Sequence, residues 1–265
     1  TSQHSTAMAT IIAGGGNSSL RSRGVAYQAN FTSSDFSNIL PDDILIFNSN
    51  NIHVQNHSYG VGIENYYGNE AFAYDQQVTT HPSLLHVFSA GNSGNLKPTA
   101  GKYVNMELAN LSGNFKQAKN VLVVNAVDTT LTVNAFNSRG PAFDGRLKPE
   151  LTAFGQDGTS DAAAIVSGIS LLLQEKYRLI HQTVPTASLV KAILIASSDD
   201  IGSKGIDYVN GYGSVNAYKA LALMEVNQII SVTLASNEEV TIPITIPSSV
   251  SEIKVAVTWT DPPAI

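Results

Sequence analysis

Residues 158–168 read GTSDAAAIVSG, and this stretch predicts the start of a buried helix. Ser160 stands in the first turn, and nearly all the residues after it are small, which allows a helix to enter a protein core. The N–H groups of a first helical turn have no intrahelical acceptor, and the helix dipole favours negative charge there. The stretch therefore indicates either a binding site at a helix N-terminus or the plainer alternative, in which threonine and serine only cap the helix.

Short apolar segments alternate with helical patterns on both sides of this stretch. Helices are predicted at His4–Ala13, Pro41–Asn50, Asn69–Thr80, Thr159–Tyr177, Thr186–Ser197 and Ser214–Val226. Strands are predicted at Val25–Thr32, Ile52–Gln55, Leu84–Ser89 and Asn120–Asn125. Apolar strands alternating with helices are typical of a parallel sheet covered on both faces, so we expect an α/β fold in three layers.

The pattern changes after about Asn227. Segments Ile229–Leu234, Val240–Ile246 and Ile253–Thr260 alternate apolar and polar residues, which indicates antiparallel strands. We therefore expect a domain over residues 1–226, followed over 227–265 by the first strands of a β-sandwich. Such strands alone would leave edges unpaired, and the chain starts without an initiator methionine or a signal peptide, so we expect a middle piece of a longer protein.

Composition excludes several classes of function. The 265 residues carry a formal net charge of −6 without a Lys/Arg cluster, which argues against a nucleic-acid partner. No apolar run approaches the ~20 residues of a membrane-spanning helix. Cysteine is absent, which excludes disulfide and thiolate chemistry and leaves the compartment open.

Two further segments suggest that Ser160 is more than a cap. His4 opens a helix of small residues in QHSTAMA (residues 3–9), and Asn92 follows a buried strand in the glycine-flanked turn FSAGNSG (residues 88–94). Histidine, asparagine and serine are the residue types that serve as general base, oxyanion donor and nucleophile. Each alone is readily explained as a structural residue, but three at element ends of one α/β domain are not.

These motifs resemble those of the subtilisin-like serine proteases, the subtilases. The family's histidine motif H-G-T-x-x-A resembles residues 4–9, its A-G-N-x-G matches residues 90–94, and its G-T-S-x-A-x-P resembles residues 158–164. Between and after these lie further matches in the family's order, at residues 24–26 (GVA), 56–60 (NHSYG), 138–141 (SRGP), 144–149 (DGRLKP) and 211–217 (GYGSVNA). Residues 257–261 (VTWTD) resemble the β-domain that follows the catalytic domain in one branch of the family.

The resemblance implies a serine endopeptidase, secreted or at the cell surface and of bacterial origin, that acts on polypeptides. Ser160 is then the nucleophile, His4 the general base, and Asn92 an oxyanion donor. Residues expected to line an extended substrate are Ser58, Tyr59, Gly60, Ser89, Ala90 and Gly91. The family's catalytic aspartate precedes the histidine, and no Asp precedes His4, so the resemblance places it upstream of Thr1, in the same chain or in a nicked segment that stays bound.

Departures from the motifs keep a second hypothesis open, a subtilase-derived binding or scaffold module without catalysis. Ser5 replaces a glycine, Asp161 an apolar residue and Ala164 a proline, and only two residues separate Gly155 from Gly158 where relatives carry a longer hairpin.

The sequence predicts no cofactor and no metal site. His53 and His57 are four apart, but their segment is predicted as a strand and no third ligand follows. Subtilases often bind calcium, so calcium stays an open alternative, but no loop here has the spacing that would locate such a site.

Overall fold

A parallel sheet forms the centre of the computed structural model, which describes residues 2–35, 37–225, 229–246 and 248–264. The sheet has four strands in the order β1-β2-β3-β4, namely β1 (Val54–His57), β2 (Leu85–Ser89), β3 (Leu122–Val127) and β4 (Leu151–Phe154). Asn56 pairs with Val87, and Phe88 with Val123. Because all strands run in one direction, their carboxyl ends meet at one edge of the sheet.

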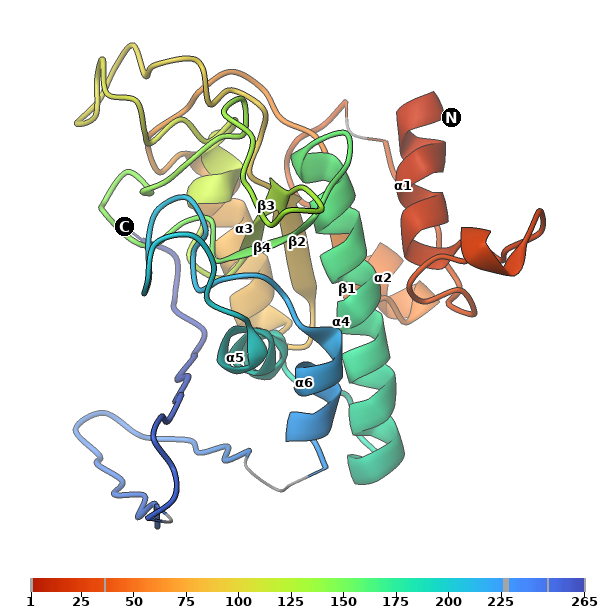
Figure 1. Ribbon diagram of the computed structural model, residues 1–265, viewed down its shortest axis with the longest axis vertical. Coiled ribbons are helices and arrows are strands. Elements are labelled where there is room, and N and C mark those ends of the chain that lie inside the picture. The colour runs from red at the N-terminus through yellow and green to blue at the C-terminus, as the bar shows by residue number, and fades with distance from the viewer. Residues whose placement is uncertain (1, 36, 226–228, 247, 265) are drawn as a thin grey trace.

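Helices cover both faces of the sheet (Figure 1). They are α1 (Gln3–Ala13), α2 (Ile44–Asn50), α3 (Asn69–Thr80), α4 (Thr159–His181), α5 (Ala187–Ser197) and α6 (Ala217–Leu223), with short 3-10 turns η1 (Leu20–Ser22) and η2 (Asn114–Gln117). Helix α4 packs against every strand, and its small residues Ala162 and Ala163 are fully buried against Val87 and Val124. On the other face Tyr74 of α3 packs with Phe88 and Phe115. The three-layer α/β prediction is confirmed.

Most predicted elements exist, with shifted ends. Helix α2 begins at Ile44 because the Asp43 carboxylate accepts the Leu45 N–H and caps it, and α4 continues to His181. Strand β4 was not predicted. The strand predicted at Val25–Thr32 is wrong, because the N–H groups of Val25 and Ala26 donate to the Ile11 and Ile12 carbonyls at the end of α1 and so pair with no strand.

The strands predicted after Asn227 are not formed in the described residues 229–246 and 248–264, which run along the outside of the domain without helix or strand (Figure 1). A strand needs a hydrogen-bonded neighbour, and the apolar side chains of this segment, such as Val232 and Val257, are largely exposed. The expected boundary near residue 226 lies outside the described residues. Residues 261–264 nevertheless contact the domain, since Asn120 exchanges two hydrogen bonds with the Asp261 backbone, at 2.8 and 2.9 Å.

Asp75 in α3 organises this contact region. Its buried carboxylate accepts hydrogen bonds from the Asn120 N–H at 2.7 Å, the Lys119 N–H at 3.0 Å and the Tyr67 hydroxyl at 2.8 Å. Tyr67 in turn accepts the Ala264 N–H at 3.1 Å. One side chain therefore links α3, the loop before β3 and the C-terminal segment.

We expect Asp75→Ala to lower the free energy of unfolding by about 3 kcal/mol, because it leaves buried donors without an acceptor. Urea denaturation measures the change. Glu107→Ala is the control, since the Glu107 side chain is 81% exposed and its ion pair with Lys97 contributes little. Equal stability of the two variants would contradict this account of Asp75.

Candidate active site

Two segments predicted to bind substrate lie at the carboxyl edge of the sheet. Residues 58–60 follow β1 directly, and residues 89–91 begin at the last position of β2. The N-terminus of α4 meets both, because the Ser58 hydroxyl donates to the Ser160 carbonyl at 2.8 Å and the Gly91 N–H donates to Thr159 Oγ1 at 3.0 Å. Crevices at the carboxyl edge of a parallel sheet are the usual place for ligands in α/β folds.

His4 and Ser160 meet at one atom, the Ser58 carbonyl oxygen. His4 Nε2 lies 2.9 Å from it and Ser160 Oγ lies 3.3 Å from it. Ser2 fixes the start of α1 by accepting the Ser5 N–H at 3.0 Å, and this places His4 in the first turn. The fold thus brings together two side chains that are far apart in the sequence.

The contact with Ser58 also defines the state of the His4 ring. A carbonyl oxygen only accepts, so His4 Nε2 carries a proton in this arrangement. Among the described residues, no carboxylate forms a hydrogen bond or ion pair with His4. An acceptor at Nδ1 would move the proton there and free Nε2 to act as a base.

Thr159 orients the amide of Asn92. The Asn92 Oδ1 atom accepts from Thr159 Oγ1 at 3.0 Å and from the Thr159 N–H at 3.3 Å, and Nδ2 of this exposed residue donates no hydrogen bond within the described residues. Gly158 has a φ of 121°, and a Cβ atom there would lie 3.0 Å from the Asn92 amide. Glycine therefore allows the close approach. The G-T-S motif contains Thr159, but its place in the sequence indicates only a cap for the helix that follows.

The departures from the family motifs have local structural roles. The Asp161 carboxylate accepts the Asp157 N–H at 3.0 Å and so braces the short connection before α4. Beside this connection lies a cavity of about 340 Å³, which is lined by Gly155, Gly158 and residues that follow β3. Ala164 is fully buried, and Ser5 belongs to the α1 cap.

A chain of hydrogen bonds runs from Tyr59 into the core. Tyr59 bonds to His57 Nδ1 at 3.0 Å, His57 Nε2 to His86 Nδ1 at 3.0 Å, and His86 Nε2 to Gln77 Oε1 at 2.9 Å. Since an amide oxygen only accepts, the donor direction runs from Tyr59 to Gln77. Burial holds the pKa of both imidazoles low, that of His86 at about 3, so both rings are neutral and position Tyr59.

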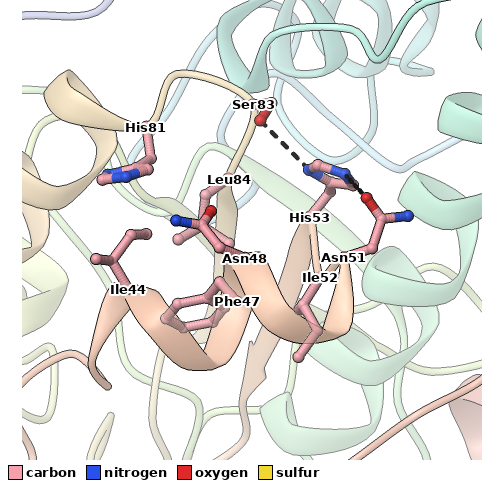
Figure 2. Close-up of a pocket in the computed structure, with 9 residues that line it drawn as sticks. All are labelled: Ile44, Phe47, Asn48, Asn51, Ile52, His53, His81, Ser83 and Leu84. Atoms are coloured by element: carbon pink, nitrogen blue, oxygen red, sulfur yellow. Dashed lines mark hydrogen bonds between the residues drawn. The ribbon is translucent and has the colours of Figure 1, made fainter.

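The hollow shown in Figure 2 lies at the opposite edge of the sheet. It has a volume of about 120 Å³ and is bordered by His53, which contacts Ser83 and Asn51 just before the amino ends of β2 and β1. It is separate from Ser160. In the described parts of the chain, no three His, Asp or Glu side chains gather closely enough to hold a metal ion. No helix among them has the length and apolarity to cross a membrane.

Comparisons with known proteins agree with this fold. The chain is 22% identical to the solved prenylagaramide maturation protease PagA, with 83% of this chain and 81% of that chain covered and a TM-score of 0.60. It is 23% identical to tripeptidyl peptidase 2, with 84% of this chain and 19% of that chain covered and a TM-score of 0.66. These likenesses establish the fold alone.

A curated relative also matches, the serine protease/ABC transporter B family protein tagA of Dictyostelium discoideum. It is 26% identical over an alignment 179 residues long, which covers 48% of this chain and 10% of that protein. The match therefore spans about a tenth of the relative's length. The model of the subtilase family (Peptidase S8) matches residues 1–213, about four-fifths of the chain, and the chain belongs to the subtilase family.

Proposed function

We propose that this chain carries the catalytic centre of a serine endopeptidase, with Ser160 as nucleophile, His4 as general base and Asn92 as oxyanion donor. The observation that supports it most is the convergence of His4 Nε2 and Ser160 Oγ on the Ser58 carbonyl oxygen, at 2.9 and 3.3 Å. Membership of a family of serine peptidases supports it independently.

In the proposed reaction, Ser160 Oγ attacks the carbonyl carbon of a peptide bond while its proton passes to His4 Nε2. The carbonyl oxygen becomes an oxyanion, which Asn92 Nδ2 and the Ser160 N–H stabilise. The carbon–nitrogen bond then breaks as the proton moves from Nε2 to the leaving nitrogen. Water takes the place of the leaving amine and hydrolyses the acyl-enzyme by the same proton route.

The ring state of His4 supports the further proposal that an aspartate preceding His4 completes the triad. With Nε2 protonated and bonded to Ser58, the imidazole is in the wrong tautomer for a base. A carboxylate at Nδ1 corrects the tautomer and stabilises the imidazolium that forms. We propose that this aspartate belongs to a segment before Thr1, either in the same chain or in a piece that stays bound after nicking.

Residues 58–60 and 89–91 are proposed to hold an extended polypeptide substrate. They end neighbouring parallel strands and flank Ser160, so their main-chain groups suit pairing with a peptide backbone. The cavity beside Gly158 gives room on the other side of the catalytic serine.

A fluorophosphonate tests the proposal, because only an activated serine reacts with it. In the full-length natural protein, we expect one adduct, at Ser160, located by mass spectrometry. His4→Ala should abolish labelling, whereas His181→Ala, at an exposed histidine at the end of α4, should leave it unchanged. A folded protein that stays unlabelled would favour the alternative, a binding or scaffold module that has lost catalysis.

A further inference from the structure

A buried lysine lies behind the two proposed substrate segments. Lys116 of η2 is fully buried, and its ammonium donates to Ser112 Oγ at 2.8 Å. Ser112 itself is only 4% exposed. Burying a charged amine is costly unless an anion or several acceptors compensate it, so the surroundings of Lys116 need an explanation.

Ser112 fits between the substrate segments. A Cβ atom on Gly60 would lie 2.3 Å from Ser112 Oγ, and one on Gly91 would lie 2.0 Å from it. The Ser112 backbone also joins both sides, since its N–H donates to the Ala90 carbonyl and its carbonyl accepts the Val61 N–H. Ser112 therefore forms the floor between residues 58–60 and 89–91.

No acid compensates the Lys116 ammonium. Among the described residues it takes part in no ion pair and has Ser112 as its one hydrogen-bond partner, besides the nearby Phe115 ring at 5.6 Å. The hydroxyl proton of Ser112 likewise has no acceptor among them. Both groups therefore have unused capacity to donate to an anion.

The other buried lysines of the domain differ in this respect. Lys148 forms an ion pair with Glu150 at 2.5 Å, and Lys191 lies 3.4 Å from the carbonyl oxygens of residues 119, 120 and 121. Their acceptors come from the protein itself. Lys116 lacks a carboxylate or a group of carbonyl oxygens of this kind. Of the three lysines, Lys116 is the one beside the proposed substrate site.

The two proposed substrate segments both contact Ser112, which lies in front of Lys116. We propose that the side chain of the residue immediately before the scissile bond enters between residues 58–60 and 89–91, and that Lys116 and Ser112 select aspartate or glutamate there. This inference rests on the proposed function and deepens it. The Ser112 hydroxyl donates to the substrate carboxylate, and the ammonium behind it supplies the opposite charge.

Matched pairs of peptides test the proposal in the full-length protein. We expect kcat/KM to be roughly 10- to 100-fold higher for glutamate than for glutamine at this position, or for aspartate than for asparagine, as charge-assisted hydrogen bonds provide. Lys116→Met should bring the acid-to-amide ratio of kcat/KM close to one for the pair that the wild type discriminates more strongly, while the amide peptide is still cleaved. Ser112→Ala should lower the same ratio. Lys191→Met, at a buried lysine remote from the site, should leave it unchanged.

The ratio should also depend on pH. Burial lowers the pKa of Lys116 to about 7, so the ammonium predominates below that pH and the neutral amine above it. The acid-to-amide ratio of kcat/KM should therefore be largest on the acidic side and fall as pH rises through about 7. Any effect of pH on the bond-breaking steps is common to the two peptides and cancels in the ratio.

Burial also shifts the pKa values of the histidines and tyrosines near Lys116. His57 and His86 have pKa values held low by burial, and Tyr59 and Tyr74 have pKa values raised by it. The Glu64 carboxylate accepts hydrogen bonds from the N–H and Nδ2 of Asn114, two residues before Lys116. A ratio that does not change with pH in the wild type would contradict the assignment to Lys116.

The outcomes separate this inference from the proposed function. Cleavage with no preference for acids, or with a preference that Lys116→Met leaves intact, would overturn the role of Lys116 and leave the peptidase proposal standing. If no peptide is cleaved and Ser160 is not labelled, the peptidase proposal fails. In that case, the affinities of peptides that end in glutamate or glutamine for the Ser160→Ala variant are measured by fluorescence anisotropy. Equal affinities of the two peptides would overturn the role of Lys116.

Discussion

Replacing Ser160 by alanine should lower kcat of the full-length protein by about 10⁶-fold, the loss known for the equivalent change in subtilisin. The variant keeps the proposed oxyanion donors and the proposed substrate segments but has no hydroxyl to form the acyl-enzyme. His4→Ala should cost about as much, and the double variant little more, because nucleophile and base act as one unit. Steady-state hydrolysis of a fluorogenic peptide measures kcat.

The control for this experiment is Ser170→Ala. Ser170 is a fully buried serine of the same helix, and within the described part of the chain its hydroxyl bonds to the Val166 carbonyl alone, at 2.8 Å. Its loss should leave kcat unchanged. Undiminished turnover by Ser160→Ala would show that another residue carries the chemistry, and additive losses in the double variant would show that His4 does not serve Ser160.

Asn92→Ala should lower kcat by about 10²- to 10³-fold with little change in KM, because its bond to the oxygen strengthens as negative charge develops. The magnitude is again that of subtilisin. Asn95→Ala, at an exposed asparagine in the same turn, is the matched control. A loss that appears in KM instead of kcat would assign Asn92 to substrate binding.

Thr159→Val asks whether Asn92 must be held in place. Thr159 Oγ1 donates to Asn92 Oδ1 at 3.0 Å, and valine has a similar shape without the hydroxyl. We expect a smaller fall in kcat than for Asn92→Ala, and no further fall in kcat when Asn92 is already alanine. Because Thr159 Oγ1 also accepts the N–H of Gly91 in a proposed substrate segment, we expect KM to rise as well. Independent effects of the two changes would mean that Thr159 acts through the stability of α4.

The elements in the core were predictable because their signals are local. Small residues over 159–168 mark a helix that fits closely against a sheet, and continuous apolar runs such as Leu84–Ser89 mark strands buried on both faces. The same reasoning failed for Val25–Thr32, where apolar composition suited a strand but the N–H groups are taken by the end of α1. After Asn227 the alternating pattern is not accompanied by strands in the described residues, because such a pattern forms a strand only if a neighbour pairs with it.

The sequence by itself determined the family, the order of the motifs and the residue types available for chemistry at His4, Asn92 and Ser160. Only the tertiary structure decided that His4 and Ser160 share the Ser58 carbonyl, that Thr159 orients Asn92, and that Ser112 brings Lys116 to the floor between the substrate segments. The physical reason is that motifs depend on neighbours along the chain. The environment of a buried charge such as Lys116 depends on residues from several elements, whose positions are fixed only when the layers pack.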